Sequence, residues 1–341
     1  MGFARVGRYA GVLVAFLLFG QDTIRVTVSE VLVPVTVTDP KGRFVSNLDK
    51  EDFKIYDNGQ EQTIDFFSRD RNQPVVIGFL MDLSNNSKIH WKDYQEATIN
   101  LVDTLMPGGD KRYSGYLIGY RSEPDLMVDT THDSEIIVDK LRGAKPGGGS
   151  ALYDALYEAC TNRKLVVGEP IEPRRVVVII GDGHDNSSKK TFQEVLELAQ
   201  RQLVTIYGVS TSSYGTGNDE DDDVLLKLAK ATGGKVEYPL ENVYRDIAGY
   251  LEVPTDYGNY AYDVGTGGYS AAKASSIFRA IANLSGEITT QYILRYVPDI
   301  PEDSKNIRDI EVKVMLPDVK VRARRAYYPF SVPEVKTLTP R

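Results

Sequence analysis

The sequence has a single cysteine, Cys160, in a chain of 341 residues. One cysteine cannot form an intramolecular disulfide, and it leaves almost no scope for a zinc site built on thiolates. Positive charge is also in short supply, because 48 acidic residues outnumber 40 Lys and Arg and give a formal net charge of −8. We therefore expect no nucleic-acid partner, since the chain has no basic stripe to neutralise phosphates.

The N-terminal apolar stretch is too short to span a membrane comfortably. This stretch, YAGVLVAFLLFG from Tyr9 to Gly20, is uncharged and follows Arg5 and Arg8. A basic segment followed by a short apolar one is typical of a secretory signal. We expect residues 1–20 to be a signal peptide and the protein to be exported, to the periplasm, the cell surface or the medium. The alternatives are a buried strand or an uncleaved anchor, which would be the chain's one membrane contact.

Residues 21–70 have the pattern of antiparallel β structure. VLVPVTVTD alternates apolar and polar residues, and FKIYDNGQEQTIDFF contains two alternating runs separated by Asn58-Gly59. An Asn-Gly pair between such runs predicts a hairpin, because both residues tolerate positive φ.

From Pro74 the pattern changes to α/β. VVIGFLMD and RRVVVIIGD are apolar at almost every position, which is typical of strands buried on both faces of a parallel sheet. Segments with helical spacing alternate with these and further strands, so a doubly wound, mostly parallel sheet is expected over residues 74–287. Residues 241–276 are rich in Gly and Tyr, and we interpret them as an insertion. A helix, SIFRAIANLSG, follows.

The β pattern returns over residues 288–330, before a tail at 331–341. TTQYILRYV, DIEVKVML and VKVRARRAYY are the predicted strands, with Pro317-Asp318 as a turn between the last two. Neither terminal β segment has enough strands to bury a core alone. We therefore expect the two segments to pack together as a β-sandwich, with the α/β domain inserted between them.

Two carboxylates are predicted to meet at one edge of the α/β sheet. Open α/β sheets bind ligands outside the carboxyl ends of their strands, where the strand order reverses. In the common order the first and fourth strands flank that point, and here they end at Asp82 and Asp182. Two such acids repel each other unless a positive group lies between them.

Small oxygen-bearing side chains surround these acids in the sequence. Ser84 and Asn86 follow Asp82 at alternate positions, and Ser150 ends the loop KPGGGS. Few carboxylates with several neutral oxygens suit a hard cation such as Mg²⁺. A plainer interpretation is that Asp82 and Ser84 cap the next helix, that Gly147 to Gly149 form a flexible connector, and that Asp182-Gly183 is an ordinary turn.

Three motifs in order resemble the von Willebrand factor A domain. They are Asp82-x-Ser84-x-Asn86, then GSALYD from Gly149, then IGDG from Ile180. The resemblance covers about Pro74 to Tyr238. The flanking β segments resemble those of a VWFA-related family known mainly from acidobacterial genomes.

The resemblance implies a metal-ion-dependent adhesion site, or MIDAS. Its implied metal ligands are Asp82, Ser84, Asn86, Ser150 and Asp182. The expected ion is Mg²⁺, with Mn²⁺ or Ca²⁺ as alternatives, and the expected partner is a protein with an exposed Asp or Glu. Such a protein is a binder, with a role such as adhesion, and not an enzyme.

Asn86 departs from the family pattern, which has Ser at this position. An Asn carbonyl can bind Mg²⁺, but the side chain is longer than serine and would displace the ion. Two other functions therefore stay open: a metal-free structural or assembly scaffold with a degenerate site, and a metal-dependent hydrolase that uses the same acids. For a hydrolase the sequence supplies no base or nucleophile by motif, and we expect His184 to be a solvent-facing loop residue.

Overall fold

The structure, a computed structural model, describes residues 30–69, 74–165, 173–212, 223–240, 266–299 and 306–329. The predicted signal peptide, the C-terminal tail and residues 241–265 of the predicted insertion lie outside these ranges. Within the described part of the chain, no helix combines the length and the apolar character that crossing a membrane requires.

The middle of the chain forms a six-stranded sheet in the order β10-β9-β8-β5-β6-β7. Its strands are β5 (Val75–Asp82), β6 (Tyr113–Tyr120), β7 (Pro124–Thr131), β8 (Arg174–Gly181), β9 (Thr205–Ser210) and β10 (Val236–Glu237). All neighbours are parallel except β7, which pairs antiparallel with β6 at one edge. Counted along the chain, this is the common doubly wound order 3-2-1-4-5-6. The predicted fold class is confirmed.

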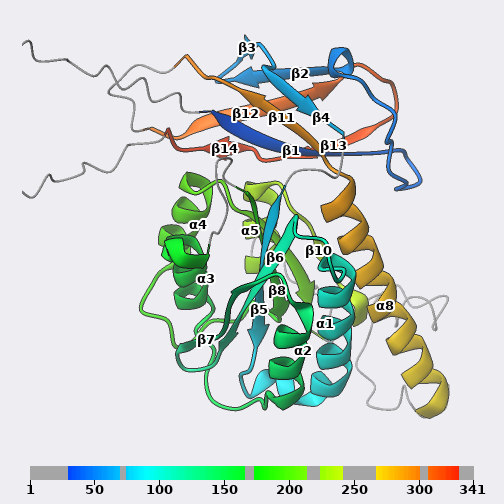
Figure 1. The fold of residues 1–341 in the computed structure, drawn as a ribbon, viewed down its shortest axis with the longest axis vertical. Helices are drawn as coiled ribbons and strands as arrows, with labels where there is room; N and C mark the ends of the chain where they lie inside the picture. Colours follow the sequence, from blue (N-terminus) through cyan, green and yellow to red (C-terminus); the bar gives the residue numbers. More distant parts are fainter. Residues whose placement is uncertain are drawn as a thin grey trace, which may run out of the picture.

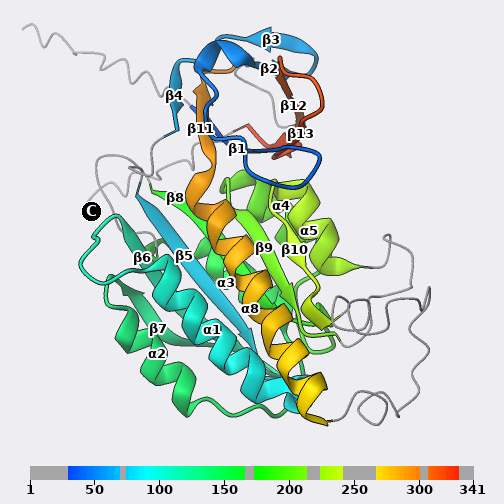
Figure 2. The ribbon, with the colours of Figure 1, turned by 90° about the vertical axis from the view of Figure 1, so that its right-hand side faces the viewer.

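Helices cover both faces of this sheet (Figure 2). One face carries α1 (Trp91–Leu105), α2 (Ser134–Gly143) and α8 (Thr266–Thr290); the other carries α3 (Leu152–Thr161), α4 (Phe192–Arg201) and α5 (Val224–Thr232). Alternate residues of β5 enter the two cores: Phe79 packs under α1, and Leu80 packs under α3. A strand between two helical layers needs apolar side chains on both faces, which explains the uninterrupted apolar run.

Helix ends follow local sequence signals. Thr191 and Glu194 form a reciprocal capping box at the start of α4, and Asp133 caps α2 by accepting the Glu135 N–H. Gly233 ends α5 with a φ of +87°, a conformation that glycine adopts without strain. Three short 3₁₀ helices complete the described elements: η1 (Lys50–Asp52), η2 (Asn86–His90) and η3 (Arg163–Leu165).

The two terminal β segments form a sandwich of two four-stranded sheets (Figure 1). One sheet, in the order β13-β1-β11-β4, contains β13 (Lys320–Ala323), β1 (Val31–Thr38), β11 (Tyr292–Tyr296) and β4 (Phe66–Ser68). The other, in the order β14-β12-β2-β3, contains β14 (Ala326–Tyr327), β12 (Arg308–Val314), β2 (Phe53–Asp57) and β3 (Gln60–Gln62). Val33, Ile55 and Leu294 are among the residues of their common core. The predicted sandwich is therefore present, with each sheet taking strands from both ends of the chain.

The predicted hairpin turn at Asn58-Gly59 is confirmed. Both residues have positive φ, and they connect β2 to β3. The Pro317-Asp318 turn carries the chain from one sheet to the other, since β12 and β13 belong to different sheets. The helix expected from Ser276 begins ten residues earlier, at Thr266, so the last part of the predicted insertion is helical. An ion pair of 2.7 Å between Lys273 and Asp93 on α1 is one contact that stabilises this extension.

Candidate metal centre

The candidate site lies at the carboxyl ends of β5 and β8, at the end of the α/β domain opposite the sandwich (Figures 1 and 2). β5 lies between β6 and β8, so the strand order reverses beside it. Asp82 is the last residue of β5, and Asp182 directly follows β8. In the structure, as predicted, the two carboxylates lie at the same edge of the sheet, at the switch point.

The first loop turns so that alternate side chains face one way. The Ser84 N–H donates to Oδ1 of Asp82 over 2.7 Å, and the Asn86 N–H donates to Oγ of Ser84 over 3.2 Å. Asp82 and Ser84 are buried, with 1% and 2% of their surfaces exposed, whereas Asn86 is exposed. Neither Asp82 nor Ser84 caps α1, whose N-cap position is His90.

Asn86 joins the first loop to the third. Its Nδ2 donates to Oδ2 of Asp182 over 3.2 Å, and the other carboxylate oxygen of Asp182 accepts the His184 N–H over 2.9 Å. The donor half of the Asn86 amide therefore faces the acid that the cation would neutralise.

Ser150 enters the site from the second loop and is buried. Its hydroxyl donates to the carbonyl of His184 over 2.7 Å, so the hydroxyl oxygen keeps lone pairs for a ligand. The glycines before it are fixed by hydrogen bonds: the Gly147 N–H donates to the Leu83 carbonyl, and the Asn85 N–H donates to the Gly148 carbonyl. The second loop is thus held directly against the first.

The electrostatics of Asp82 reflect its position. Burial raises the pKa of this carboxyl to about 6, the Ser84 hydrogen bonds oppose that rise, and the nearby charge of Asp182 adds to it. Oδ2 of Asp82 is buried and has no hydrogen-bond partner among the described residues. A buried carboxylate oxygen without a donor is costly unless a proton or a cation compensates it.

The donor set fits a hard divalent cation. It offers two carboxylates, two hydroxyls and an amide carbonyl, and one of the carboxylate oxygens is buried and unsatisfied. Within the described residues, no three His, Cys, Asp or Glu side chains gather at one point, so a site rich in acids or imidazoles is not present there. An ion here would depend on Ser84, Asn86 and Ser150. That these residues are ligands stays a prediction.

Sequence reasoning missed a set of residues that fixes the second and third loops to each other. Asn186 accepts the Ser150 N–H at its Oδ1 over 2.9 Å, and its own N–H donates to the Ser150 carbonyl. Asp185 accepts the N–H of Tyr153 on α3 and the hydroxyl of Ser188. Asp154, in the first turn of α3, accepts the N–H groups of residues 189 and 190. The available signal was the run Asp-Asn-Ser-Ser, which begins at Asp185, three positions after Asp182.

His184 and Cys160 differ in exposure. His184 is exposed, as expected of a solvent-facing loop residue. Cys160 is buried, and burial raises the pKa of its thiol to about 11, which leaves it unreactive.

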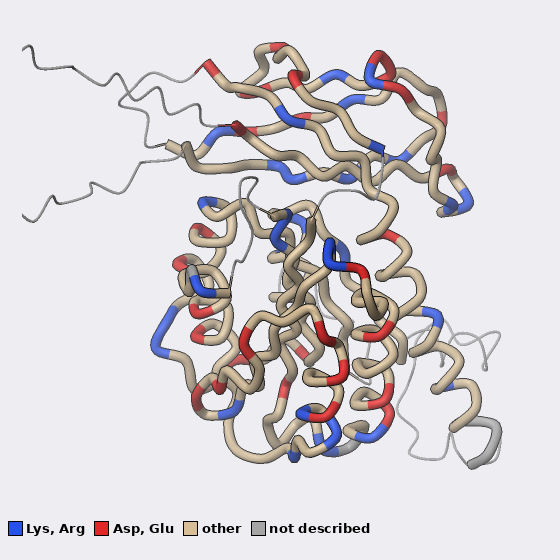
Figure 3. Tube along the Cα trace, in the orientation of Figure 1, with Lys and Arg blue, Asp and Glu red and all other residues tan. Residues whose placement is uncertain are grey.

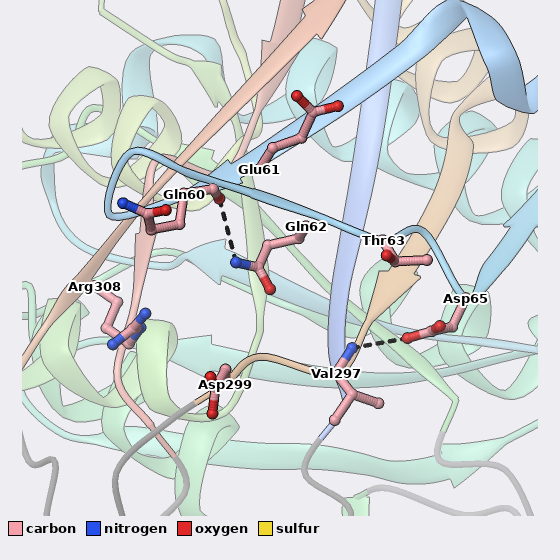
Figure 4. Close-up of a pocket in the computed structure, with 8 residues that line it drawn as sticks. All are labelled: Gln60, Glu61, Gln62, Thr63, Asp65, Val297, Asp299 and Arg308. Carbon is pink, nitrogen blue, oxygen red and sulfur yellow. Dashed lines mark hydrogen bonds between the residues drawn. The ribbon is translucent and has the colours of Figure 1, made fainter.

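A polar groove is lined by residues of the sandwich (Figure 4). It is lined by Gln60, Glu61, Gln62, Thr63, Asp65, Val297, Asp299 and Arg308. Much of its polar capacity is already used: Asp65 accepts the Val297 N–H over 3.0 Å, and Arg308 donates to the buried Asp57 over 2.7 Å. Groups committed in this way do not converge on a ligand, so the switch-point crevice is the stronger candidate.

The α/β domain has the doubly wound, mostly parallel sheet that the resemblance to von Willebrand factor A domains implied. No family model matches the chain, and no curated protein matches it.

Solved structures with this fold have low identity to the chain. Proximal thread matrix protein 1 from the mussel byssus, solved with a zinc-occupied MIDAS motif, is 12% identical over 68% of this chain and 49% of its own, with a TM-score of 0.41. BatB from Bacteroides thetaiotaomicron is 18% identical over 61% of this chain and 98% of its own, with a TM-score of 0.36. The SpRpn10 VWA domain is 11% identical over 48% and 86%, with a TM-score of 0.37. The chain spans about half of the mussel protein, and these likenesses concern the fold alone.

Proposed function

We propose that this chain is an exported binding protein that captures an acidic side chain of a protein partner through a divalent cation. Asp82, Ser84, Asn86, Ser150 and Asp182 would hold the ion. The ion would supply a positive coordination position that a partner's carboxylate can occupy. Mg²⁺ is the expected ion, and Mn²⁺ or Ca²⁺ would suit the same oxygens.

The observation that supports this function is the unsatisfied Oδ2 of Asp82. That atom is buried beside a second carboxylate, and the structure surrounds both acids with small hydroxyl and amide groups. A cation would compensate the charges of both carboxylates at once. Among the described residues, no hydrogen-bond donor compensates Oδ2 of Asp82.

Binding is preferred to catalysis for a reason visible in the site. The Ser150 proton is directed at the backbone carbonyl of His184 and not at a base, and the side chain of His184 is exposed. A nucleophile needs a positioned base, and this hydroxyl lacks one.

A metal-free scaffold is the second candidate, and one contact favours it. The Nδ2 of Asn86 already donates to Asp182, so a neutral amide partly takes the place of the cation's charge. In that case the domain would serve as an assembly module with an empty crevice.

The melting temperature of the chain in EDTA and in Mg²⁺ or Mn²⁺ tests the proposal. A ligand that binds only the folded state stabilises it by about 2.7 kcal/mol at a hundredfold excess over Kd. We expect a cation-dependent rise that Asp182→Ala abolishes and that Asp139→Ala, at an exposed position on α2, retains. Capture of a protein partner should then require the cation. A wild-type chain with no shift at millimolar cation would favour the metal-free scaffold.

A further inference from the structure

Two buried polar atoms without partners among the described residues lie at the carboxyl ends of β5 and β6. Oδ2 of Asp82 and the hydroxyl of Tyr120 are buried, and neither has a hydrogen-bond partner among the described residues. Nearly all buried polar groups in proteins are hydrogen-bonded, so two exceptions at one site call for an explanation.

The two atoms are neighbours because of the register of the sheet. Tyr120 pairs with Asp82 across β6 and β5, and Gly181 is the next residue in the same row on β8. A Cβ atom at Gly181 would lie 2.3 Å from the Tyr120 hydroxyl, 2.9 Å from Cβ of Asp82 and 3.4 Å from its Oδ2. The Tyr120 ring therefore crosses the Asp82 strand and places its hydroxyl where β8 has no side chain.

The two groups are chemically complementary. Burial, followed by the charges of Asp82, Asp182 and Asp185, raises the pKa of the Tyr120 hydroxyl, so it keeps its proton and can donate. A carboxylate accepts at about four lone-pair positions, of which the Ser84 N–H uses one. A donor and an acceptor, both unsatisfied, face the same small space above Gly181.

We propose that Tyr120 is a positioning residue of this site: a small shift from the described geometry, in which the two atoms are not hydrogen-bonded, lets its hydroxyl donate to Oδ2 of Asp82 and holds the carboxylate with its remaining lone pairs toward the cation site. A glycine is needed at position 181, because any side chain there would occupy the place of the Tyr120 hydroxyl. The inference deepens the proposed function. Only the cation measurement below rests on that function, because the closeness of the Tyr120 hydroxyl to Asp82 does not depend on the ion.

Tyr116 is a matched control on the same strand and the same face. Its hydroxyl lies 2.3 Å from the position that a Cβ of Gly78 would take, so the ring crosses a glycine in the same way. Tyr116 is also buried, but it lies four residues earlier, away from the carboxyl end of β6. Replacing either tyrosine by Phe removes one hydroxyl and keeps the ring.

The first measurement is a double-mutant cycle in EDTA. The unfolding equilibrium in urea is measured for the wild type, Tyr120→Phe, Asp82→Ala and the double variant. The same cycle is measured with Tyr116→Phe in place of Tyr120→Phe. We expect the effect of Tyr120→Phe on the unfolding equilibrium constant to differ about fivefold between the Asp82 and Asp82→Ala backgrounds. For Tyr116→Phe the two backgrounds should agree within about twofold. Equal effects of Tyr120→Phe in both backgrounds would overturn the proposal.

The second measurement is the cation dissociation constant by titration calorimetry. We expect Tyr120→Phe to weaken Mg²⁺ or Mn²⁺ binding about tenfold and Tyr116→Phe to leave it unchanged. If Tyr120 and Asp82 are coupled in EDTA but the wild type binds no cation, the positioning role is upheld and the cation-dependent function is excluded. Weaker cation binding without coupling would contradict a role that acts through Asp82.

Discussion

At the scale of single residues, Asn86 decides how readily the crevice accepts an ion. Its amide donates to the same Asp182 oxygen that faces the first loop, and it is the residue that departs from the family pattern. An ion that takes this oxygen must displace the amide. The cost is that of one hydrogen bond to a charged group, about 1.5 kcal/mol or more.

We therefore predict that Asn86→Ser strengthens divalent cation binding about tenfold, because it removes the competing amide and supplies a shorter oxygen ligand. Titration calorimetry with Mn²⁺ would measure the change. Asn85→Ser is the control, since the backbone N–H of Asn85 makes the contact with Gly148 that the structure shows. Unchanged or weaker binding by Asn86→Ser would mean that the Asn86 carbonyl is a better ligand than proposed.

Asp82 gives the site a definite pH dependence. Its folded-state pKa of about 6 lies above the value of about 3.9 for an unfolded chain, so the folded state holds the proton more tightly. In the absence of metal, stability through this group is greatest below about pH 4 and falls as the pH rises to about 6, by on the order of 3 kcal/mol.

A cation competes with that proton, so we expect its stabilising effect to grow over the same range. The Mg²⁺-dependent rise in melting temperature should be large at pH 7.5 and small at pH 5. Melting curves with Mg²⁺ and with EDTA at both pH values would measure it, with Asp82→Asn as the variant that lacks the titration. An equal rise at both pH values would rule out Asp82 as a ligand.

At the scale of elements, the loop between β8 and α4 supports the site by holding the loop before α3. Asn186 binds both the N–H and the carbonyl of Ser150, and Ser150 is fully enclosed. Removing one acceptor leaves a buried N–H unsatisfied, which costs about 1–3 kcal/mol.

Asn186→Ala should therefore lower the free energy of unfolding by about 1–3 kcal/mol and weaken cation binding as well. Urea unfolding and titration of the same sample would give both quantities. Asn100→Ala is the control, because Asn100 is exposed on α1 and bonds the carbonyl of Glu96 in the preceding turn. Loss of stability with intact cation affinity would show that Ser150 needs no support from this loop.

At the scale of the whole molecule, a polar chain joins the α/β domain to the sandwich. Glu287, near the end of α8, is buried, accepts the Thr36 hydroxyl over 3.2 Å and pairs with Arg322. Gln291 donates to the same Thr36 and accepts from Arg174 at the start of β8 over 2.6 Å. β1, β13, α8 and β8 are thus tied at one place, and α8 continues into β11 (Figure 1).

Lys and Arg residues occur at both ends of the α/β domain (Figure 3). Arg174, at the start of β8, is buried. Glu287→Ala leaves Arg322 without its carboxylate partner. We predict a loss of about 2–3 kcal/mol, with both parts unfolding in one transition. Glu311→Ala, which removes an exposed pair with Lys313, should change stability by less than about 0.5 kcal/mol. Calorimetry would measure both, and two separate transitions would contradict the prediction.

Much of the α/β domain follows from local sequence. β5 and β8 are predicted as strands buried on both faces because every position of β5 before Asp82, and every position of β8 after Arg174 and Arg175, is apolar or glycine. In the sandwich, the turn at Asn58-Gly59 follows from residues that tolerate positive φ. The convergence of Asp82 and Asp182 was also predictable, because a doubly wound sheet brings the ends of its first and fourth strands together.

Other features depend on contacts between residues far apart in the chain. Residues 266–276 begin close to two glycines, which disfavour a helix, and the ion pair between Lys273 and Asp93 joins this part of α8 to α1. Asn186 and Tyr120 gain their relation to the site only from the register of neighbouring strands and loops. The sequence by itself determined which side chains supply oxygen atoms and which strands are buried, since these depend on residue type and short spacing. The tertiary structure decided which oxygens are left without partners, because that depends on every group that packs around them.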